Sequence, residues 1–434
     1  MSGPGTLALV GAGCGTGIAS VCAIGMLQIE QLLGGLWSVA AVLLAAALCG
    51  LLARAFARLS AVVPSGAGLL AFLSRGLGRQ SGLVIAAPYF LLTLILVGAE
   101  ATIVGTLLAR VLPVPVAAGA LLFLVGTWAL CRAGVQIGYR AQAAATAGLV
   151  LCMAWLSMLA ITGAADRGSL ASALIPHAPS AVHFMAGTGE ALFLFMGFEL
   201  ITSHAEIARS PRAIGRSLPI SVGVLAAFYS LVSLGFSCLD AKAAAAGYRF
   251  VPQLAIAEQA RSPVAVALMI VLSLLASFTC FNGALLALSR FACALAAQGT
   301  LPRRFGRLDP RTMVPRKALS VLLAVAIGAT ALVGFGGALE PAILAAAIAA
   351  SLVYGCAAWV RERPPFAEEE RGRGIRLVGR ALALGLFALG VAVAVDAGGA
   401  RAGTLLLVGA AYGGALLLAR RARPARLPEP AHGD

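Results

Sequence analysis

Long apolar segments alternate with short polar segments along the whole chain. Twelve segments are mainly apolar, and they cover about residues 7–27, 34–56, 82–109, 115–131, 141–163, 187–207, 217–239, 264–297, 317–336, 340–360, 377–396 and 402–420. A helix needs about 20 predominantly apolar residues to cross a bilayer, and most of these segments reach that length. The pattern therefore predicts an all-α membrane protein with twelve transmembrane helices.

Two of the segments carry an interruption near their middle. Gly11–Gly17 places four glycines in seven residues, and Phe193–Glu199 combines Gly197 with a carboxylate. Each glycine destabilises a helix by about 1 kcal/mol relative to alanine. A broken helix persists at membrane depth only when it is buried in protein or lines a cavity. We therefore expect a packing surface or a binding site at both interruptions.

The interrupted segments are the first and the sixth, five apart in the chain. Inverted repeats of five spans, each beginning with a discontinuous helix, are a recurring plan of transporters. We expect one membrane transport domain over residues 1–434, with a first repeat at 1–163, a second at 187–361 and two additional spans at 377–420. In such a plan the ends of the half-helices face the substrate near the bilayer midplane.

Composition supports the membrane class and charge gives the orientation. The residues are 60% apolar and only 11% charged, which excludes an ordinary soluble protein. With the N-terminus inside, 26 Lys and Arg residues fall on the inner side and 6 on the outer side. This asymmetry predicts that both termini are cytoplasmic, and it explains the net charge of +15 without a nucleic-acid partner. The ratio of 30 Arg to 2 Lys suggests a GC-rich bacterium and hence a bacterial cytoplasmic membrane.

Metal and cofactor chemistry find no support in the sequence. All nine cysteines lie within or at the ends of apolar segments, and no CxxC pair occurs. Cysteines in such positions usually pack as small buried hydrophobic residues and form neither disulfides nor metal sites. His177 and His183 share a predicted loop without a metal-ligand spacing. We therefore predict no metal site and no cofactor apart from a coupling H⁺ or Na⁺.

Four stretches, in order along the chain, resemble motifs of the amino acid–polyamine–organocation (APC) superfamily of permeases. They are Gly15-Thr16-Gly17-Ile18; Ala53–Ser60 with Pro64-Ser65-Gly66-Ala67-Gly68; Met196-Gly197-Phe198-Glu199 with Glu206 and Arg209-Ser210-Pro211-Arg212; and Ser289-Arg290 with Gln298-Gly299-Thr300-Leu301-Pro302 and Val314-Pro315. The resemblance implies a LeuT-like fold of ten core helices plus two. It also implies alternating access and a small substrate with an amine and usually a carboxylate.

The resemblance also implies a set of substrate-binding residues. Backbone N–H groups of Gly15, Thr16 and Gly17, with the Thr16 hydroxyl, would hold a carboxylate. Phe193 matches an aromatic gate, and carbonyl groups near Phe193 and Met196 would receive the amine. Gly283-Ala284 replaces a large aromatic residue of some relatives and suggests room for a bulkier side chain. The candidate binding residues are Ala12, Gly13, Gly15, Thr16, Gly17, Phe193, Phe195, Met196, Gly197 and Ala284.

The coupling ion is left open between protons and sodium. Glu100 and Glu199 lie within predicted spans, where a charge is costly and usually functional. Glu100 is interpreted as a proton carrier, an amine partner or a neutral acid between helices, and Glu199 as a support for the second interruption or a proton acceptor. Sodium-independent relatives often carry a lysine at the position matching Leu149, which this chain lacks. Ser277 and Thr279 supply hydroxyls that could ligate sodium.

These observations favour a secondary active transporter of amino acids or related small amines, coupled to protons or working by exchange. A sodium-coupled amino acid symporter is the first alternative, and a membrane sensor that binds substrate without moving it is an alternative of another class. An enzyme is not expected, because no clustered catalytic residues appear in the spans. The predicted partners are a small-molecule substrate and the lipid bilayer, with the oligomeric state open.

Overall fold

The structure is a computed structural model, and it describes residues 5–65, 67–134, 139–166, 168–175, 178–204, 208–239, 248, 250–259, 262–312, 314–362 and 373–421. Gly66, His177 and Glu206, which were singled out above, lie outside the described residues.

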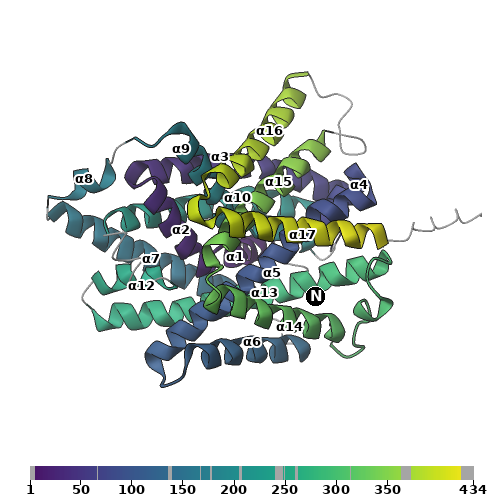
Figure 1. The fold of residues 1–434 in the computed structure, drawn as a ribbon, viewed down its shortest axis with the longest axis horizontal. Coiled ribbons are helices and arrows are strands. Elements are labelled where there is room, and N and C mark those ends of the chain that lie inside the picture. Colours follow the sequence, from purple (N-terminus) through teal and green to yellow (C-terminus); the bar gives the residue numbers. More distant parts are fainter. Residues whose placement is uncertain are drawn as a thin grey trace, which may run out of the picture.

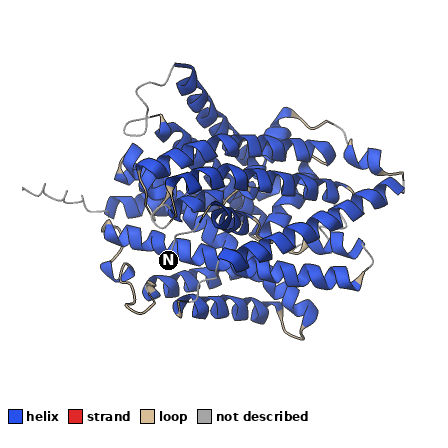
Figure 2. Ribbon diagram, turned by 180° about the vertical axis from the view of Figure 1, so that it is seen from behind, coloured by secondary structure: helices blue, strands red, loops and turns tan. Residues whose placement is uncertain are grey.

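The described chain is helical throughout, and Figure 2 shows helices joined by loops. The helices are α1 (Thr6–Gly17), α2 (Val21–Leu32), α3 (Gly35–Val62), α4 (Leu69–Leu77), α5 (Arg79–Val111), α6 (Val116–Arg132), α7 (Tyr139–Asp166), α8 (Leu170–Leu174), α9 (Ala181–Leu194), η1 (Phe198–His204), α10 (Pro211–Ser237), α12 (Pro252–Gln259), α13 (Pro263–Ala297), η2 (Arg303–Phe305), α14 (Arg316–Thr330), η3 (Ala331–Phe335), α15 (Leu339–Arg361), α16 (Arg373–Asp396), η4 (Gly398–Ala400) and α17 (Arg401–Arg421).

The predicted all-α membrane fold is confirmed. Ten helical segments are long and apolar enough to cross a bilayer, and the bent pair α1 and α2 makes an eleventh. The apolar helix α6, with 17 residues, corresponds to the remaining expected segment. Serine caps mark several helix starts: Ser210 Oγ accepts a hydrogen bond from the Ala213 N–H at 3.2 Å, and Pro211 follows at the first helical position.

The connecting segments add three shorter helices that the apolar pattern did not predict: α4, α8 and α12. Figure 1 places α4 and the C-terminal end of α17 toward one end of the molecule, and α8 and α12 toward the opposite end. The long helices run between these two ends, as expected for helices that cross a membrane.

The first interruption lies later in the chain than the glycines suggested. Gly11, Gly13, Gly15 and Gly17 are all helical within α1, and the chain breaks at Ile18–Ser20. The axes of α1 and α2 differ by 62°. The glycines instead permit close packing: a Cβ atom on Gly11 would lie 2.7 Å from the Ala143 Cβ. Tertiary contacts therefore keep the glycine-rich stretch helical despite its low intrinsic propensity.

The second interruption lies where the sequence predicted it. Helix α9 ends at Leu194, and the chain turns through Phe195–Gly197 before η1 begins. Gly197 has a φ of +108°, a conformation that side chains rarely adopt. A Cβ atom there would lie 3.1 Å from the carbonyl carbon and oxygen of Thr16. The two interruptions therefore contact each other through their backbones.

Candidate functional site

A cavity of about 80 Å³ lies beside the two interruptions. A water molecule needs about 10–15 Å³ by such a measure, so the cavity holds several waters or one small solute. Its walls come from α1, α2, α5, α9, η1, α13 and the two breaks. The lining residues are Thr16, Ala19, Val21, Cys22, Tyr89, Phe90, Thr93, Leu96, Val97, Glu100, Phe193, Met196, Gly197, Leu200, Cys280, Phe281, Ala284, Ala287 and Leu288.

The α1 side of the cavity presents hydrogen-bond acceptors. The Thr16 hydroxyl lies within hydrogen-bond distance of three carbonyl oxygens: 3.0 Å from those of Ala12 and Gly13, and 3.1 Å from that of Gly197. The Gly17 carbonyl accepts from the Tyr229 hydroxyl at 2.7 Å. Because α1 ends at Gly17, its last carbonyl groups are the ones left without partners inside the helix.

This polarity differs from the expectation for Gly15, Thr16 and Gly17. These residues form the last turn of α1, where the helix dipole is negative and favours a cation. The free N–H groups of the interruption belong to the next helix, which begins with Ser20 as its N-cap. The dipole at this helix end therefore favours a cation over a carboxylate next to Gly15–Gly17.

Glu100 of α5 occupies the N-terminus of α2. Its two carboxylate oxygens accept the backbone N–H of Ser20 at 3.0 Å and that of Val21 at 2.9 Å, and the Ser277 hydroxyl donates to one of them. The side chain is buried, with 3% of its surface exposed, and it also lines the cavity. A carboxylate stabilised by a helix N-terminus and a hydroxyl can remain charged at membrane depth.

Glu199 of η1 holds the second break in place. It accepts hydrogen bonds from the hydroxyls of Tyr89 on α5 and Tyr354 on α15, the latter at 2.9 Å. It also accepts from the Gly197 N–H at 3.0 Å. Glu199 does not line the main cavity but a smaller neighbouring one of about 20 Å³. Its contacts join α5, α15 and the break between α9 and η1.

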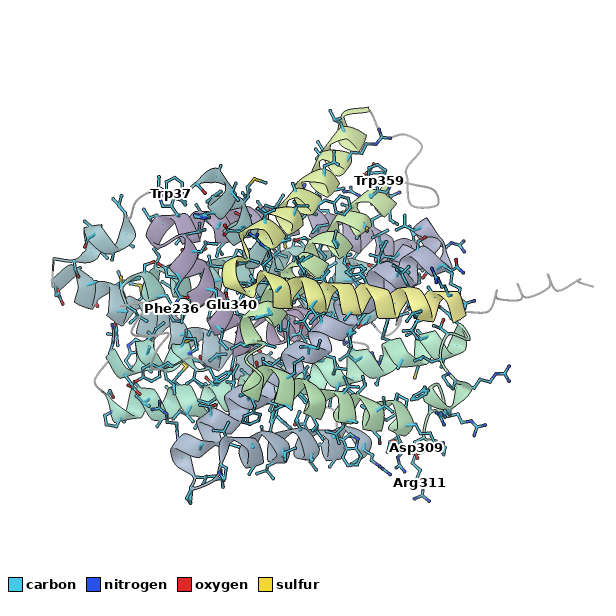
Figure 3. All side chains as sticks on the ribbon, viewed as in Figure 1. Trp37, Phe236, Asp309, Arg311, Glu340 and Trp359 are labelled. Atoms are coloured by element: carbon cyan, nitrogen blue, oxygen red, sulfur yellow. The ribbon has the colours of Figure 1, made fainter. Side chains whose placement is uncertain are left out.

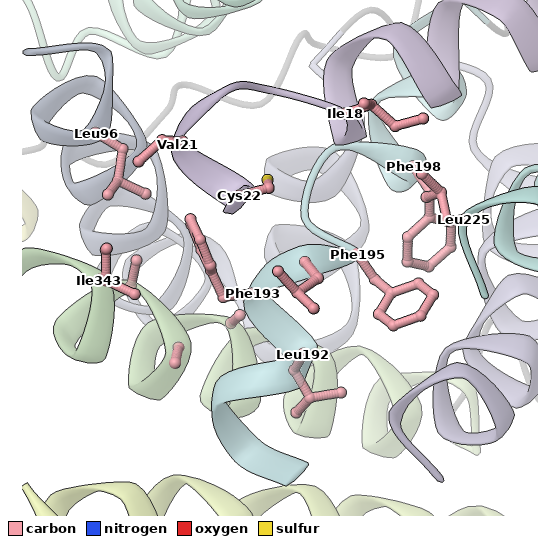
Figure 4. Packing of buried hydrophobic residues seen from close by; sticks show 14 of the residues in the cluster. Ile18, Val21, Cys22, Leu96, Leu192, Phe193, Phe195, Phe198, Leu225 and Ile343 are labelled. Carbon is pink, nitrogen blue, oxygen red and sulfur yellow. The ribbon is translucent and has the colours of Figure 1, made fainter. Parts of the chain in front are cut away.

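The structure brings only some of the predicted binding residues to the cavity. Thr16, Phe193, Met196, Gly197 and Ala284 line it. Figure 4 shows Phe193 reaching from α9 toward Val21 and Leu96, on the same side as Cys22. The other five predicted binding residues do not line the cavity. Ala12, Gly13, Gly15 and Gly17 are buried within α1, and Phe195 packs edge-on against Tyr229 with 6.1 Å between the ring centroids.

The two predicted sodium ligands do not meet at one site. The Ser277 hydroxyl donates to Glu100, whereas the Thr279 hydroxyl donates to the Ala276 carbonyl at 2.9 Å. Residues two apart on an α-helix point to different faces, which explains the separation. Leu149, the position that lacks a lysine, lines a separate cavity of about 30 Å³ beside Ile18 and Ser20. Among the described residues, no group of three or more His, Cys, Asp or Glu side chains is placed to hold a metal ion.

Several cavity residues escaped the sequence reasoning. Tyr89 and Phe90 follow Pro88 within α5, and Cys22 of α2 and Cys280 of α13 also line the cavity. A tyrosine within a mainly aliphatic span was the one available signal, because its hydroxyl requires a buried partner. The cysteines gave no signal, since a single cysteine in an apolar segment is usually interpreted as a buried packing residue.

Comparisons with known proteins bear on the family and the fold of the chain. The family model described as "Amino acid permease" matches residues 7–395. An uncharacterized transporter of Mycobacterium tuberculosis is 29% identical over 273 residues, which cover 60% of this chain and 57% of that protein. Cationic amino acid transporter 4 of Mus musculus is 30% identical over 161 residues, covering 35% of this chain and 25% of that protein. The chain therefore spans less than two thirds of the length of the curated relatives it matches.

Among solved structures, a manganese transporter of Eremococcus coleocola, in complex with an aromatic bis-isothiourea substituted compound, has a similar fold. The two share a TM-score of 0.57 and 16% sequence identity, over 96% of this chain and 95% of that one. At this identity the likeness shows the fold alone.

Proposed function

Because this chain belongs to the amino acid permease family, we propose that it is a membrane transporter. It would carry a small amino acid or a related amine across the bacterial cytoplasmic membrane by alternating access. One observation carries the proposal: the two broken helices, α1–α2 and α9–η1, meet at one buried cavity. Helix ends at membrane depth are tolerated where they are buried in protein or line a cavity, and in transporters with broken helices they face the substrate.

The arrangement of the spans supports alternating access. Residues 1–163 and 187–361 would form two repeats that move against each other, with 377–420 as additional spans. Gly197 and Thr16 join the two repeats by backbone contact, so a shift of one repeat alters the cavity directly. The Glu199 bonds to Tyr89 and Tyr354 would set which arrangement is favoured.

Uptake into proteoliposomes tests the proposal. Purified protein is reconstituted and offered a panel of labelled amino acids and amines, and we expect saturable uptake that unlabelled substrate competes. Ala284→Trp should abolish this uptake by filling the cavity, since Ala284 lines it. Ala118→Trp on the exposed face of α6 is the matched control and should transport normally. Absence of competed uptake across the panel would refute the proposal.

Two further measurements distinguish this proposal from a sodium-coupled symporter and from a sensor that binds substrate without moving it. Replacing sodium by choline leaves proton-coupled uptake or exchange unchanged but stops a sodium-coupled symporter. Saturable binding without flux in the same liposomes would identify a sensor, in which case the transport proposal fails while the cavity assignment stands.

A further inference from the structure

The cavity contains an internal carboxylate at the position where a substrate carboxylate would be expected. Both oxygens of Glu100 are engaged, one by the N–H of Ser20, the N-cap of α2, at 3.0 Å, and one by the N–H of Val21, its first residue, at 2.9 Å. A helix N-terminus is the natural binding point for an anionic substrate group in a broken membrane helix. In this protein that binding point is filled by the protein's own side chain.

The side-chain donors of the cavity wall are also used internally, and the Cys22 thiol donates to the Gly17 carbonyl at 3.4 Å. The Thr93 hydroxyl donates to the Tyr89 carbonyl at 2.8 Å, the Tyr89 hydroxyl donates to Glu199, and the Cys280 thiol donates to the Thr16 carbonyl at 3.6 Å. The Thr16 hydroxyl has three carbonyl acceptors within reach. Among the described residues that line the cavity, none is Lys, Arg, His, Asn or Gln.

The groups left to face a ligand therefore favour positive charge. They are the Glu100 carboxylate and the rings of Phe90, Phe193 and Phe281. The last turn of α1 adds its negative dipole, although the Thr16 and Gly17 carbonyls already accept hydrogen bonds. Carboxylates, helix C-termini and aromatic faces all attract cations. A substrate carboxylate would meet no counter-charge in this wall, and it would be repelled by Glu100 across a medium of low polarity.

We propose that Glu100 acts as a built-in substitute for the substrate carboxylate, so that the cavity selects small organic amines that lack a carboxylate. The inference rests on the proposed function and names its substrate class. The ammonium group lies between Glu100 and the carbonyl end of α1, and its alkyl part lies against the apolar wall formed by residues such as Val21 and Leu96.

Calorimetric titration of the purified, detergent-solubilised protein tests this with matched pairs that differ only in the carboxylate. The pairs are ethylamine and alanine, isobutylamine and valine, and isoamylamine and leucine. In the wild-type protein we expect the best amine to bind at least tenfold more tightly than its amino acid, which corresponds to about 1.4 kcal/mol. Equal or tighter binding of the amino acid overturns the inference and leaves the transporter proposal standing. If no member of any pair binds, the inference is overturned, and the transporter proposal is then decided by the uptake panel described above.

Exchange of Glu100 for a small neutral residue gives a second, opposite prediction. Glu100→Ala frees the N–H groups of Ser20 and Val21, so amine binding should fall at least tenfold while amino acid binding rises at least tenfold. Glu190→Ala removes another buried carboxylate, on α9 and outside the cavity lining, and should keep the amine preference. A parallel loss of both ligand classes in folded Glu100→Ala would overturn the assignment. The wild-type comparison decides the matter if that variant does not fold.

Discussion

The contact between the two interruptions can be tested at Gly197. In Gly197→Ala the new methyl group would lie 3.1 Å from the carbonyl carbon and oxygen of Thr16, and 3.2 Å from the Gly17 nitrogen. These are backbone atoms of a helix end, so they cannot rotate away as a side chain could. The residue would also have to keep a φ of +108°.

The size of the effect follows from these two terms. A non-glycine residue in a sparsely populated backbone region costs about 1–3 kcal/mol. Forcing a methyl group into a packed interior adds about 1–3 kcal/mol. The variant should therefore lose roughly 2–6 kcal/mol, a large share of the 5–15 kcal/mol typical of a folded protein.

The assay compares thermal unfolding in detergent with uptake in proteoliposomes. Gly197→Ala should unfold at a clearly lower temperature and lose transport. Gly223→Ala is the matched control: it lies in α10 with no atom within 4 Å of an added Cβ, and a helical alanine there should stabilise by about 0.5–1 kcal/mol. If Gly197→Ala unfolds and transports like the control, the two breaks do not touch as described and the reasoning is refuted.

Four other predictions follow from contacts elsewhere. Gly98→Ala should destabilise the packing of α5 on α14 by more than about 2 kcal/mol, because the new Cβ would lie 2.5 Å from the Ala329 carbonyl carbon. Gly126→Ala, which has open space at its Cβ, should leave stability unchanged. Equal midpoints of thermal unfolding for the two variants would contradict this prediction. Tyr354→Phe removes one hydrogen bond to Glu199 and should cost about 1.5–3 kcal/mol in denaturant unfolding, whereas an unchanged midpoint would argue that this bond is not made. Asp309, labelled in Figure 3, lies in the arginine-rich connection between α13 and α14, and its pKa is lowered from 3.8, chiefly by the Thr312 N–H that donates to it. The contribution of the Asp309 carboxylate to stability is therefore present above that pH and lost on acidification. The difference in stability between wild type and Asp309→Asn should shrink below pH 3.8, and a difference that grows would contradict the assignment. A bound substrate should slow alkylation of Cys280, which lines the cavity, but not of Cys356 on α15, and equal rates at both would move the substrate elsewhere.

Local pattern predicted most of the helices. The apolar segments 264–297 and 340–360 became α13 and α15 with ends within one residue, and 34–56 became α3, which continues six residues further to Val62. They form helices because hydrocarbon requires each span to satisfy its own backbone hydrogen bonds. The second interruption was also predictable, since Gly197 breaks an apolar run in which few residues can adopt a positive φ. The small helices α4 and α12 were missed because their sequences are short and mixed.

The first interruption shows the limit of propensity. Four glycines predicted a break at Gly11–Gly17, but α7, α10 and η1 pack so closely on α1 that glycine is required there for contact, and the helix continues to Gly17. Because the break lies at Ile18–Ser20, three residues after Gly15–Gly17, the backbone groups without helical partners at Gly15–Gly17 are carbonyls and not N–H groups. A shift of a few residues therefore reversed the expected charge preference of this part of the site.

The sequence by itself determined the class of the protein, its helical spans, the asymmetry of its basic residues and the two segments where helices break, because these depend on composition and on local spacing. Only the tertiary structure decided what faces the cavity. Glu100 and Val21 are 79 positions apart, and Glu199 and Tyr354 are 155 apart, so no local pattern links them. The role of each carboxylate depends on which N–H and hydroxyl groups folding brings to it, and this is fixed by packing between distant helices.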